Sequence, residues 1–146
     1  MRNKMLLEFA SVTVSFFVHS TEDSESLLSI ISEKLGLAPE ELHTERVDGY
    51  YGNPIVSVKA HVTGRRAREI ALGILRNLSK RAKQQIMSEL DKSMDEHDAL
   101  YLRIDRQSIN REIALSDEQP IRVKLKPKYR AGGHNSMKES YEELIR

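Results

Sequence analysis

Cationic and aromatic side chains alternate with apolar ones in two stretches near the end of the sequence. In LYLRI (100–104), Tyr101 and Arg103 take every second position, and in IRVKLK (121–126) Arg122, Lys124 and Lys126 do the same. Successive side chains of a strand point to opposite faces, so each stretch predicts a strand with one apolar and one polar face. Lys and Arg bind phosphate, and aromatic rings stack on bases. The chemistry that these residues predict is the binding of nucleic acid.

A third stretch, DGYYGNPIVSVKAHV (48–62), joins a glycine-rich turn to another alternating strand. The turn contains Tyr50 and Tyr51, and the strand places Lys59 and His61 on its polar face. Pro54 suits the first position of a strand because it cannot donate to a sheet ladder. The two tyrosines have two interpretations: they contact a ligand beside the strand, or they pack on the edge of the sheet.

Other residues could support catalysis or metal binding, but their patterns are weak. His19 and His61 could share a face, yet two histidines without a third ligand more often belong to an ordinary surface. The acids around His97 are typical of a solvated turn, and Asp105 is typical of a helix cap. The sequence contains no Gly-rich phosphate loop, no Gly-x-Ser-x-Gly and no cysteine nucleophile. We therefore expect a protein that is not an enzyme and has no cofactor.

The elements that must position these residues follow from periodicity. Strands are predicted over 7–19, 42–47, 55–62 and 100–105 and from Pro120 onward. Helices are predicted between Ser20–Asp23 and Gly36, over 65–78, from Ser79 to about Met94 and over 136–145, with a short helix or helical loop over 106–115. The predicted fold is α+β, a mostly antiparallel sheet of about five strands with three to four helices on one face. We expect residues 1–130 to form a single domain and residues 131–146 to form a flexible or short helical tail.

If helices cover the apolar face of this sheet, the other face is open to solvent. Its predicted residues include five Lys or Arg and no acid, whereas a solvated face usually mixes both signs of charge. They are Thr13, Ser15, Phe17, His19, Ser57, Lys59, His61, Tyr101, Arg103, Arg122, Lys124 and Lys126.

Charge is also unevenly distributed along the chain, although the net charge is only +1. Thr21–Asp48 holds eight acidic residues against two basic ones, and Gly64–Gln84 holds seven basic residues against one acidic. Arg65 and Arg66 open this second segment, which predicts a basic helix. Such a helix either attracts phosphate or is simply a solvated surface.

Composition limits the class of protein and its location. A chain of 146 residues, 39% hydrophobic and 31% charged, suits one globular domain. It has no cysteine, which agrees with a reducing cytoplasm. No run approaches the roughly 20 apolar residues of a membrane span, and the polar residues within 1–20 argue against a signal peptide.

Four stretches carry a family resemblance: FFVHSTED (16–23), DGYYGNPI (48–55), LYLRIDRQ (100–107) and PIRVKLKPKY (120–129). Together they resemble a family of small archaeal proteins described as predicted exosome subunits or RNA-binding proteins. That family has a fold similar to the ribosomal protein that binds 5S RNA. The resemblance implies an archaeal, cytoplasmic, RNA-associated protein, and it carries over no catalytic residue. The last fifteen residues do not clearly match the family.

The prediction is therefore a non-catalytic RNA-binding protein, which the resemblance links to the exosome or another RNA-processing complex. The predicted RNA-binding residues are Tyr50, Tyr51, Lys59, Arg65, Arg66, Tyr101, Arg103, Arg106, Arg122, Lys124, Lys126 and Lys128. The alternative is an adaptor or homodimer that associates through the sheet face or an edge strand, with aromatic anchors. A metal-dependent nuclease is a third possibility, but it would need acids that the predicted face lacks.

Overall fold

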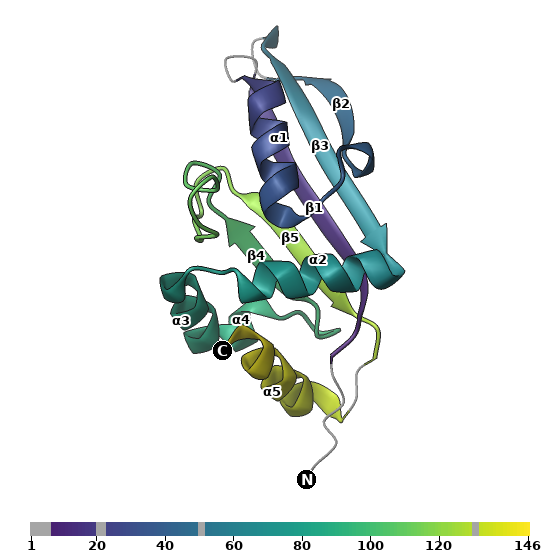
Figure 1. Cartoon of the computed structure of the whole chain (residues 1–146), viewed down its shortest axis with the longest axis vertical. Coiled ribbons are helices and arrows are strands. Elements are labelled where there is room, and N and C mark those ends of the chain that lie inside the picture. Colours follow the sequence, from purple (N-terminus) through teal and green to yellow (C-terminus); the bar gives the residue numbers. More distant parts are fainter. Residues whose placement is uncertain (1–6, 20–22, 50–51, 130–131) are drawn as a thin grey trace.

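The computed structural model describes residues 7–19, 23–49, 52–129 and 132–146, which form an α+β fold (Figure 1). Five strands make one antiparallel sheet in the order β2-β3-β1-β5-β4. They are β1 (Phe9–His19), β2 (His43–Asp48), β3 (Pro54–Thr63), β4 (Leu100–Ile104) and β5 (Ile121–Pro127). Helices α1 and α2 cross one side of the sheet, which confirms the predicted fold class. The helices are α1 (Ser24–Leu35), α2 (Gly64–Arg76), α3 (Lys80–Ser88), α4 (Leu90–Ser93) and α5 (Gly133–Ile145), with a 3₁₀ turn η1 (Pro39–Glu41).

The core lies between the helices and the apolar face of the sheet. Val12, Val14 and Val18 of the central strand β1 are at most 1% exposed. Apolar residues on one stripe of α2, such as Ile74 and Leu75, pack in the same cluster. The alternating pattern of the sequence therefore predicted the buried face of the sheet correctly. A strand shifted by one residue would bury its polar side chains instead.

Loop chemistry decides where several elements begin and end. Asp23 caps α1, since its carboxylate accepts hydrogen bonds from the backbone N–H and the hydroxyl of Ser26. Gly36 ends the same helix in a left-handed conformation (φ 75°), as predicted. Ser20, Thr21 and Glu22, the rest of the predicted capping box, lie outside the described residues.

The segment after β4 forms a loop with one hydrogen-bonded turn in place of a helix. Asp105 accepts a hydrogen bond from the Ser108 hydroxyl at 2.7 Å, and this contact turns the chain. The loop then returns along the outer edge of β4, where Asp105 N–H donates to Ala114 C=O at 2.9 Å and Ser116 N–H to Arg103 C=O at 3.0 Å. These bonds cover the β4 edge of the sheet, and β2 remains the exposed edge.

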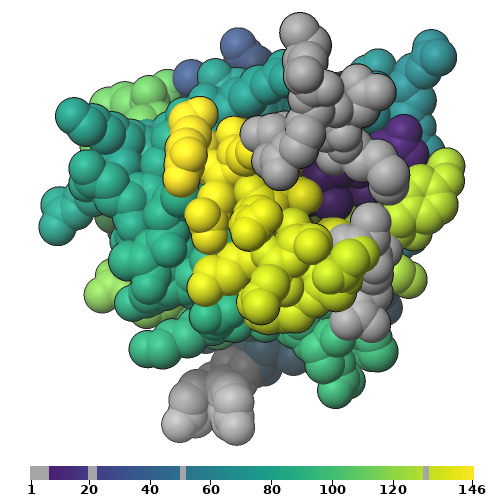
Figure 2. Space-filling model, turned by 90° about the horizontal axis from the view of Figure 1, so that it is seen from below, coloured from purple at the N-terminus to yellow at the C-terminus, as the bar shows by residue number. Residues whose placement is uncertain are grey.

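The C-terminal segment is a helix, which is one of the two forms, flexible or helical, predicted from the sequence. Helix α5 begins at Gly133 and buries Met137, Tyr141 and Ile145 in the main core. Figure 2 shows its residues in yellow, covering the lower end of the molecule beside the teal segment. Among the described helices, none has the length and apolar character needed to cross a membrane.

Candidate nucleic-acid interface

The strand registers bring cationic residues from separate strands into rows on the open face. In one row, Arg103 lies opposite Arg122, and Arg122 lies opposite Ser15 of β1. The row continues through Lys59 of β3 to His43 of β2, so it crosses all five strands. Directly opposite residues in an antiparallel sheet share a face and stand about 5 Å apart. The structure thus aligns three cations, Arg103, Arg122 and Lys59, from positions up to 63 residues apart in sequence.

A second, parallel row contains the aromatic residue of β4. Tyr101 lies opposite Lys124, which lies opposite Thr13, and Thr13 lies opposite His61. The Lys124 ammonium is 5.6 Å from the centre of the Tyr101 ring, a cation–π contact. The Tyr101 hydroxyl donates to Asp95 Oδ2 at 3.0 Å. Both ends of this exposed side chain are therefore held in place.

Asp95 is a fixed acceptor behind this tyrosine. Burial alone would raise the pKa of Asp95, but hydrogen bonds from the Ala99 and His97 backbone N–H groups and from Tyr101 outweigh it. Its pKa lies below the ordinary value as a result, so the carboxylate is ionised at neutral pH and keeps its hold on the hydroxyl.

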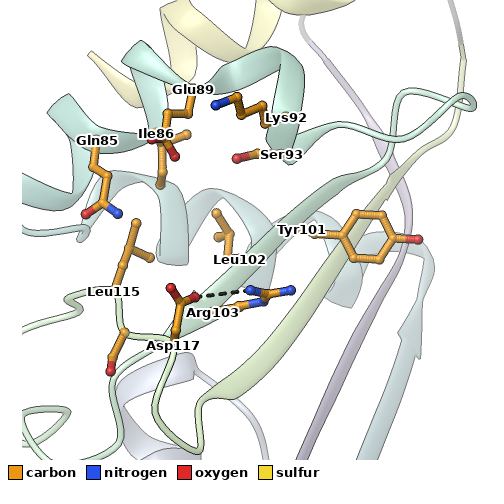
Figure 3. Close-up of a pocket in the computed structure, with 11 residues that line it drawn as sticks. Gln85, Ile86, Glu89, Lys92, Ser93, Tyr101, Leu102, Arg103, Leu115 and Asp117 are labelled. Atoms are coloured by element: carbon orange, nitrogen blue, oxygen red, sulfur yellow. Dashed lines mark hydrogen bonds and ion pairs between the residues drawn. The ribbon is translucent and has the colours of Figure 1, made fainter.

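Three cationic side chains of the face make no hydrogen bond or ion pair with another described residue. They are Lys59, Arg122 and Lys126, and all three are exposed. Arg103 differs because it forms an ion pair with Asp117 at 3.1 Å, in which both side chains are mostly exposed (Figure 3). Exposed pairs of this kind are weak and open readily to another anion.

Two shallow hollows lie on the open face, and Arg122 lines both. The first, of about 520 Å³, lies beside Tyr101 and Lys124; we call it the Tyr101 hollow. The second, of about 430 Å³, lies beside Phe17 and His19; we call it the Phe17 hollow. A third hollow, of about 320 Å³, lies beyond the edge of β4 and below α3 and α4, and the ring of Tyr101 projects away from it (Figure 3).

The face also carries acids that strand alternation did not predict. Asp95 and Asp117 come from loops, and Glu45 of β2 lies opposite Ser57 on the open side. Alternation within strands gives no information on loop residues. The position of Asp117, three residues before Pro120 opens the last strand, is the signal that could have placed it near this edge. The prediction that the open face has no acidic residue is therefore wrong. The rows that contain Arg103 and Tyr101 nevertheless include no acidic residue.

Three of the predicted RNA-binding residues, Arg65, Arg66 and Lys128, lie outside the strands that form the rows. Arg66 projects from α2 in the helical layer, where it pairs with Glu41 at 2.5 Å and Glu69 at 3.4 Å, and Arg65 is exposed beside it. Lys128 follows the end of β5 and contacts the ring of Tyr129. Tyr50 and Tyr51 lie outside the described residues.

Arg106 is a correction to the predicted interface, because its side chain is only 9% exposed. Its Nε donates to Gln119 C=O at 2.9 Å, and its Nη2 donates to Phe17 C=O. Pro120 has no N–H to offer where the pairing of β1 and β5 ends, and the guanidinium supplies donors there. Arg106 therefore positions the strand that carries Phe17.

The two histidines considered as a metal pair have other contacts. The His61 ring hydrogen-bonds Thr13 Oγ1 at 2.9 Å, and His19 lines the Phe17 hollow. Within the described ranges, no three His, Asp or Glu side chains are grouped so that they could hold a metal ion.

Helices on one face of an α+β sheet, with exposed cations and rings on the other, are an arrangement that RNA-binding domains with a sheet platform share. A family described as RNA binding matches residues 11–127. The chain belongs to this RNA-binding family. RNA-binding protein PAB1135 of Pyrococcus abyssi is 30% identical over 132 residues, covering 84% of each chain.

Solved structures are also similar to this chain. Protein AF2318 from Archaeglobus fulgidus is 30% identical with a TM-score of 0.73, covering 94% of this chain and 99% of that one. Protein SSO0741 from Sulfolobus solfataricus has a TM-score of 0.75 over 92% of this chain and 96% of its own. It is 20% identical, so this second likeness concerns the fold alone.

Proposed function

We propose that this chain binds RNA through the open face of its sheet and performs no catalytic step of its own. The observation that carries the proposal is the row Arg103, Arg122, Ser15, Lys59, His43, which crosses all five strands. Phosphates are spaced along a nucleic acid strand, and a line of Lys and Arg can neutralise several of them together. Membership of an RNA-binding family supports RNA as the ligand.

The helical layer is a weaker candidate for the same function. Arg66 is occupied by Glu41 and Glu69, and the helical layer holds much of the acidic charge of the chain. An RNA strand lying there would meet Glu33, Glu40 and Glu41 as well as the arginines. These acids would repel RNA beside Arg66, whereas α2 and α3 together hold seven basic residues against one acidic, so charge reversal on α2 is the matched comparison for the open face.

The experiment compares two double charge reversals in the full chain. Arg122→Glu with Lys124→Glu changes the open face, and Arg65→Glu with Arg68→Glu makes the same change of charge on exposed positions of α2. Binding to labelled RNA is measured by fluorescence anisotropy over a range of salt concentrations. The slope of log K against log salt should fall by about 0.7 for each lost contact with a single strand. We expect the open-face variant to lose affinity and slope, and the α2 variant to keep most of both.

Equal losses of affinity in both variants would show that binding depends on overall charge, and they would reject the open face as the RNA-binding site. No binding by the unaltered chain at low salt would reject RNA binding itself. Incubation of the RNA with the chain and divalent cations tests the second half of the proposal, because cleavage would show an enzyme.

A second candidate function is that of an adaptor, and the exposed edge of β2 favours it. All six residues of β2 are exposed, and Val47 is 42% exposed. An unpaired edge can add a strand from another chain, either a second copy or a member of a partner complex. The association with the exosome and the cytoplasmic location implied by the family resemblance belong to this part of the proposal. Size-exclusion chromatography in high salt tests self-association, since backbone pairing at an edge survives salt better than phosphate contacts do.

A further inference from the structure

Two exposed rings on the open face lack the cover that large apolar side chains usually have. Phe17 is 48% exposed and Tyr101 is 46% exposed, and they are two of four such large hydrophobic residues in the part of the chain that the structure describes. The neighbouring open positions of β1 are polar, namely Thr13, Ser15 and His19. A phenylalanine there gains little from folding, and its exposed ring is available to a ligand that can stack on it.

The registers fix how the two rings are placed relative to Arg122. Tyr101 is level with Lys124 and Thr13, and Phe17 lies four residues further along β1. With a strand spacing near 4.8 Å and a rise near 3.3 Å per residue, their Cα atoms are about 16 Å apart. Arg122 belongs to β5, the strand between β4 and β1. It pairs with Ser15, which lies midway between Thr13 and Phe17 along β1. It therefore lies near the midpoint of the diagonal from ring to ring.

The surface beside each ring is hollowed. The Tyr101 hollow and the Phe17 hollow, of about 520 and 430 Å³, meet at Arg122. Both contain polar groups that could hydrogen-bond a base edge: Thr13 and Ser15 in the first, and His19 and Gln119 in the second. This arrangement offers two flat aromatic rings with polar groups beside each. Between the rings lies Arg122, whose side chain has no hydrogen-bond or ion-pair partner among the described residues.

A base can lie on a protein ring only when it has left its own stack. In an A-form duplex the bases stack on one another, and the protein meets phosphates and 2′-hydroxyl groups. Single strands can splay their bases onto aromatic side chains. A duplex would use the cations and leave Phe17 and Tyr101 without a function.

We propose that the open face takes single-stranded RNA, with one base on Tyr101, a second on Phe17 and the phosphates between them at Arg122. This inference rests on the proposed function and adds the form of RNA that the site selects. Tyr101 is held by Asp95 and Lys124 before any ligand arrives, so stacking on its ring requires little ordering.

The test measures the affinity of the full chain for two probes at one salt concentration. One probe is a ten-nucleotide oligouridine, and the other is a blunt RNA duplex of sixteen base pairs. The variants Phe17→Thr and Tyr101→Thr remove one ring each and keep a residue that favours strands. Tyr101→Phe keeps the ring, and Tyr129→Thr removes a tyrosine that is 53% exposed beyond the end of β5.

We expect the chain to prefer oligouridine. Each ring-removing variant should lose about 5- to 150-fold in affinity for it, the range for one base stack, with duplex binding changed less than about twofold. Tyr129→Thr should bind oligouridine like the unaltered chain. Tyr101→Phe keeps the ring but loses the hydrogen bond to Asp95, so it should lose less affinity than Tyr101→Thr.

Preference for the duplex, or ring variants that bind oligouridine normally, would overturn the inference. If the Arg122 and Lys124 reversal still abolished binding in that case, the proposed function would stand. Failure of both probes to bind would remove both proposals together.

Discussion

Arg103 and Arg122 lie directly opposite one another on β4 and β5, with both side chains on the open face. Like charges in such a pair repel, at a cost of about 0.2–1 kcal/mol relative to a neutral pair. Asp117 offsets part of this cost at Arg103, whereas Arg122 has no ion-pair partner among the described residues. The position is therefore suited to binding an anion and unfavourable for stability, which is typical of functional sites.

The first prediction is that Arg122→Thr makes the fold more stable and the RNA complex weaker. Removing the guanidinium relieves repulsion on Arg103, so the free energy of unfolding should rise by a few tenths to about 1 kcal/mol. Urea denaturation measures this change, and anisotropy measures the loss of affinity. The control is Lys126→Thr on the same strand, which lies opposite Ser11 and faces no cation on β1. An Arg122→Thr variant less stable than the Lys126→Thr variant would show that the arginine pair is not strained.

The second prediction separates the two groups of arginines. Arg66 bridges α2 to η1, with hydrogen bonds to Glu41 and to Gly36 C=O, and it holds the pKa of the Glu41 carboxyl below its ordinary value. Arg66→Ala should lower the free energy of unfolding by up to about 1 kcal/mol, as for a partly exposed ion pair. Affinity for RNA should change less than about twofold. The matched variant Arg103→Ala should lose more affinity for RNA than Arg66→Ala and less stability. A larger loss of affinity in Arg66→Ala than in Arg103→Ala would place RNA on the helical layer.

Strand alternation predicted most of the fold because a sheet with one buried face leaves little choice of register. Val12, Val14 and Phe16 could only face the core, and this placed Phe17 outside. Arg103, Arg122 and Lys59 came to one face for the same reason. Their alignment in a single row depends on strand order and register, which no single strand specifies.

Loops and caps were less predictable because they depend on contacts distant in sequence. Arg106 follows a strand and looks like a surface cation, yet carbonyl groups of Phe17 and Gln119 draw it inward. The break between α3 and α4 at Glu89 has no proline or glycine to mark it. The start of α5 at Gly133 was also missed, because two glycines usually indicate a turn.

The third prediction concerns Tyr141, the fully buried aromatic residue of α5. Its hydroxyl donates to Asp98 C=O at 2.7 Å, its ring lies 6.3 Å from that of Phe9, and burial raises its pKa. Tyr141→Phe should cost about 1–2 kcal/mol because a buried carbonyl loses its donor. Tyr141→Ala should cost about 3–5 kcal/mol because it also leaves a cavity. Urea denaturation measures both, with Tyr129→Phe as an exposed control. Equal, small effects would mean that α5 is a dispensable tail.

The fourth prediction is that His134 makes the attachment of α5 dependent on pH. Its ring hydrogen-bonds Asp91 and the buried Asp98, each at 2.9 Å, with Lys138 also on Asp91. Chiefly through Asp91, these carboxylates raise the pKa of His134 above 6.5, so its contribution to stability is complete below pH 6.5 and lost as pH rises through the folded-state pKa. The lowered pKa of Asp91 has the opposite sign, with loss in acid below 3.8. Urea midpoints from pH 5.5 to 8.5 should fall for the unaltered chain and vary less for His134→Gln. With His43→Gln on the edge strand as the control, identical slopes in all three proteins would contradict the prediction.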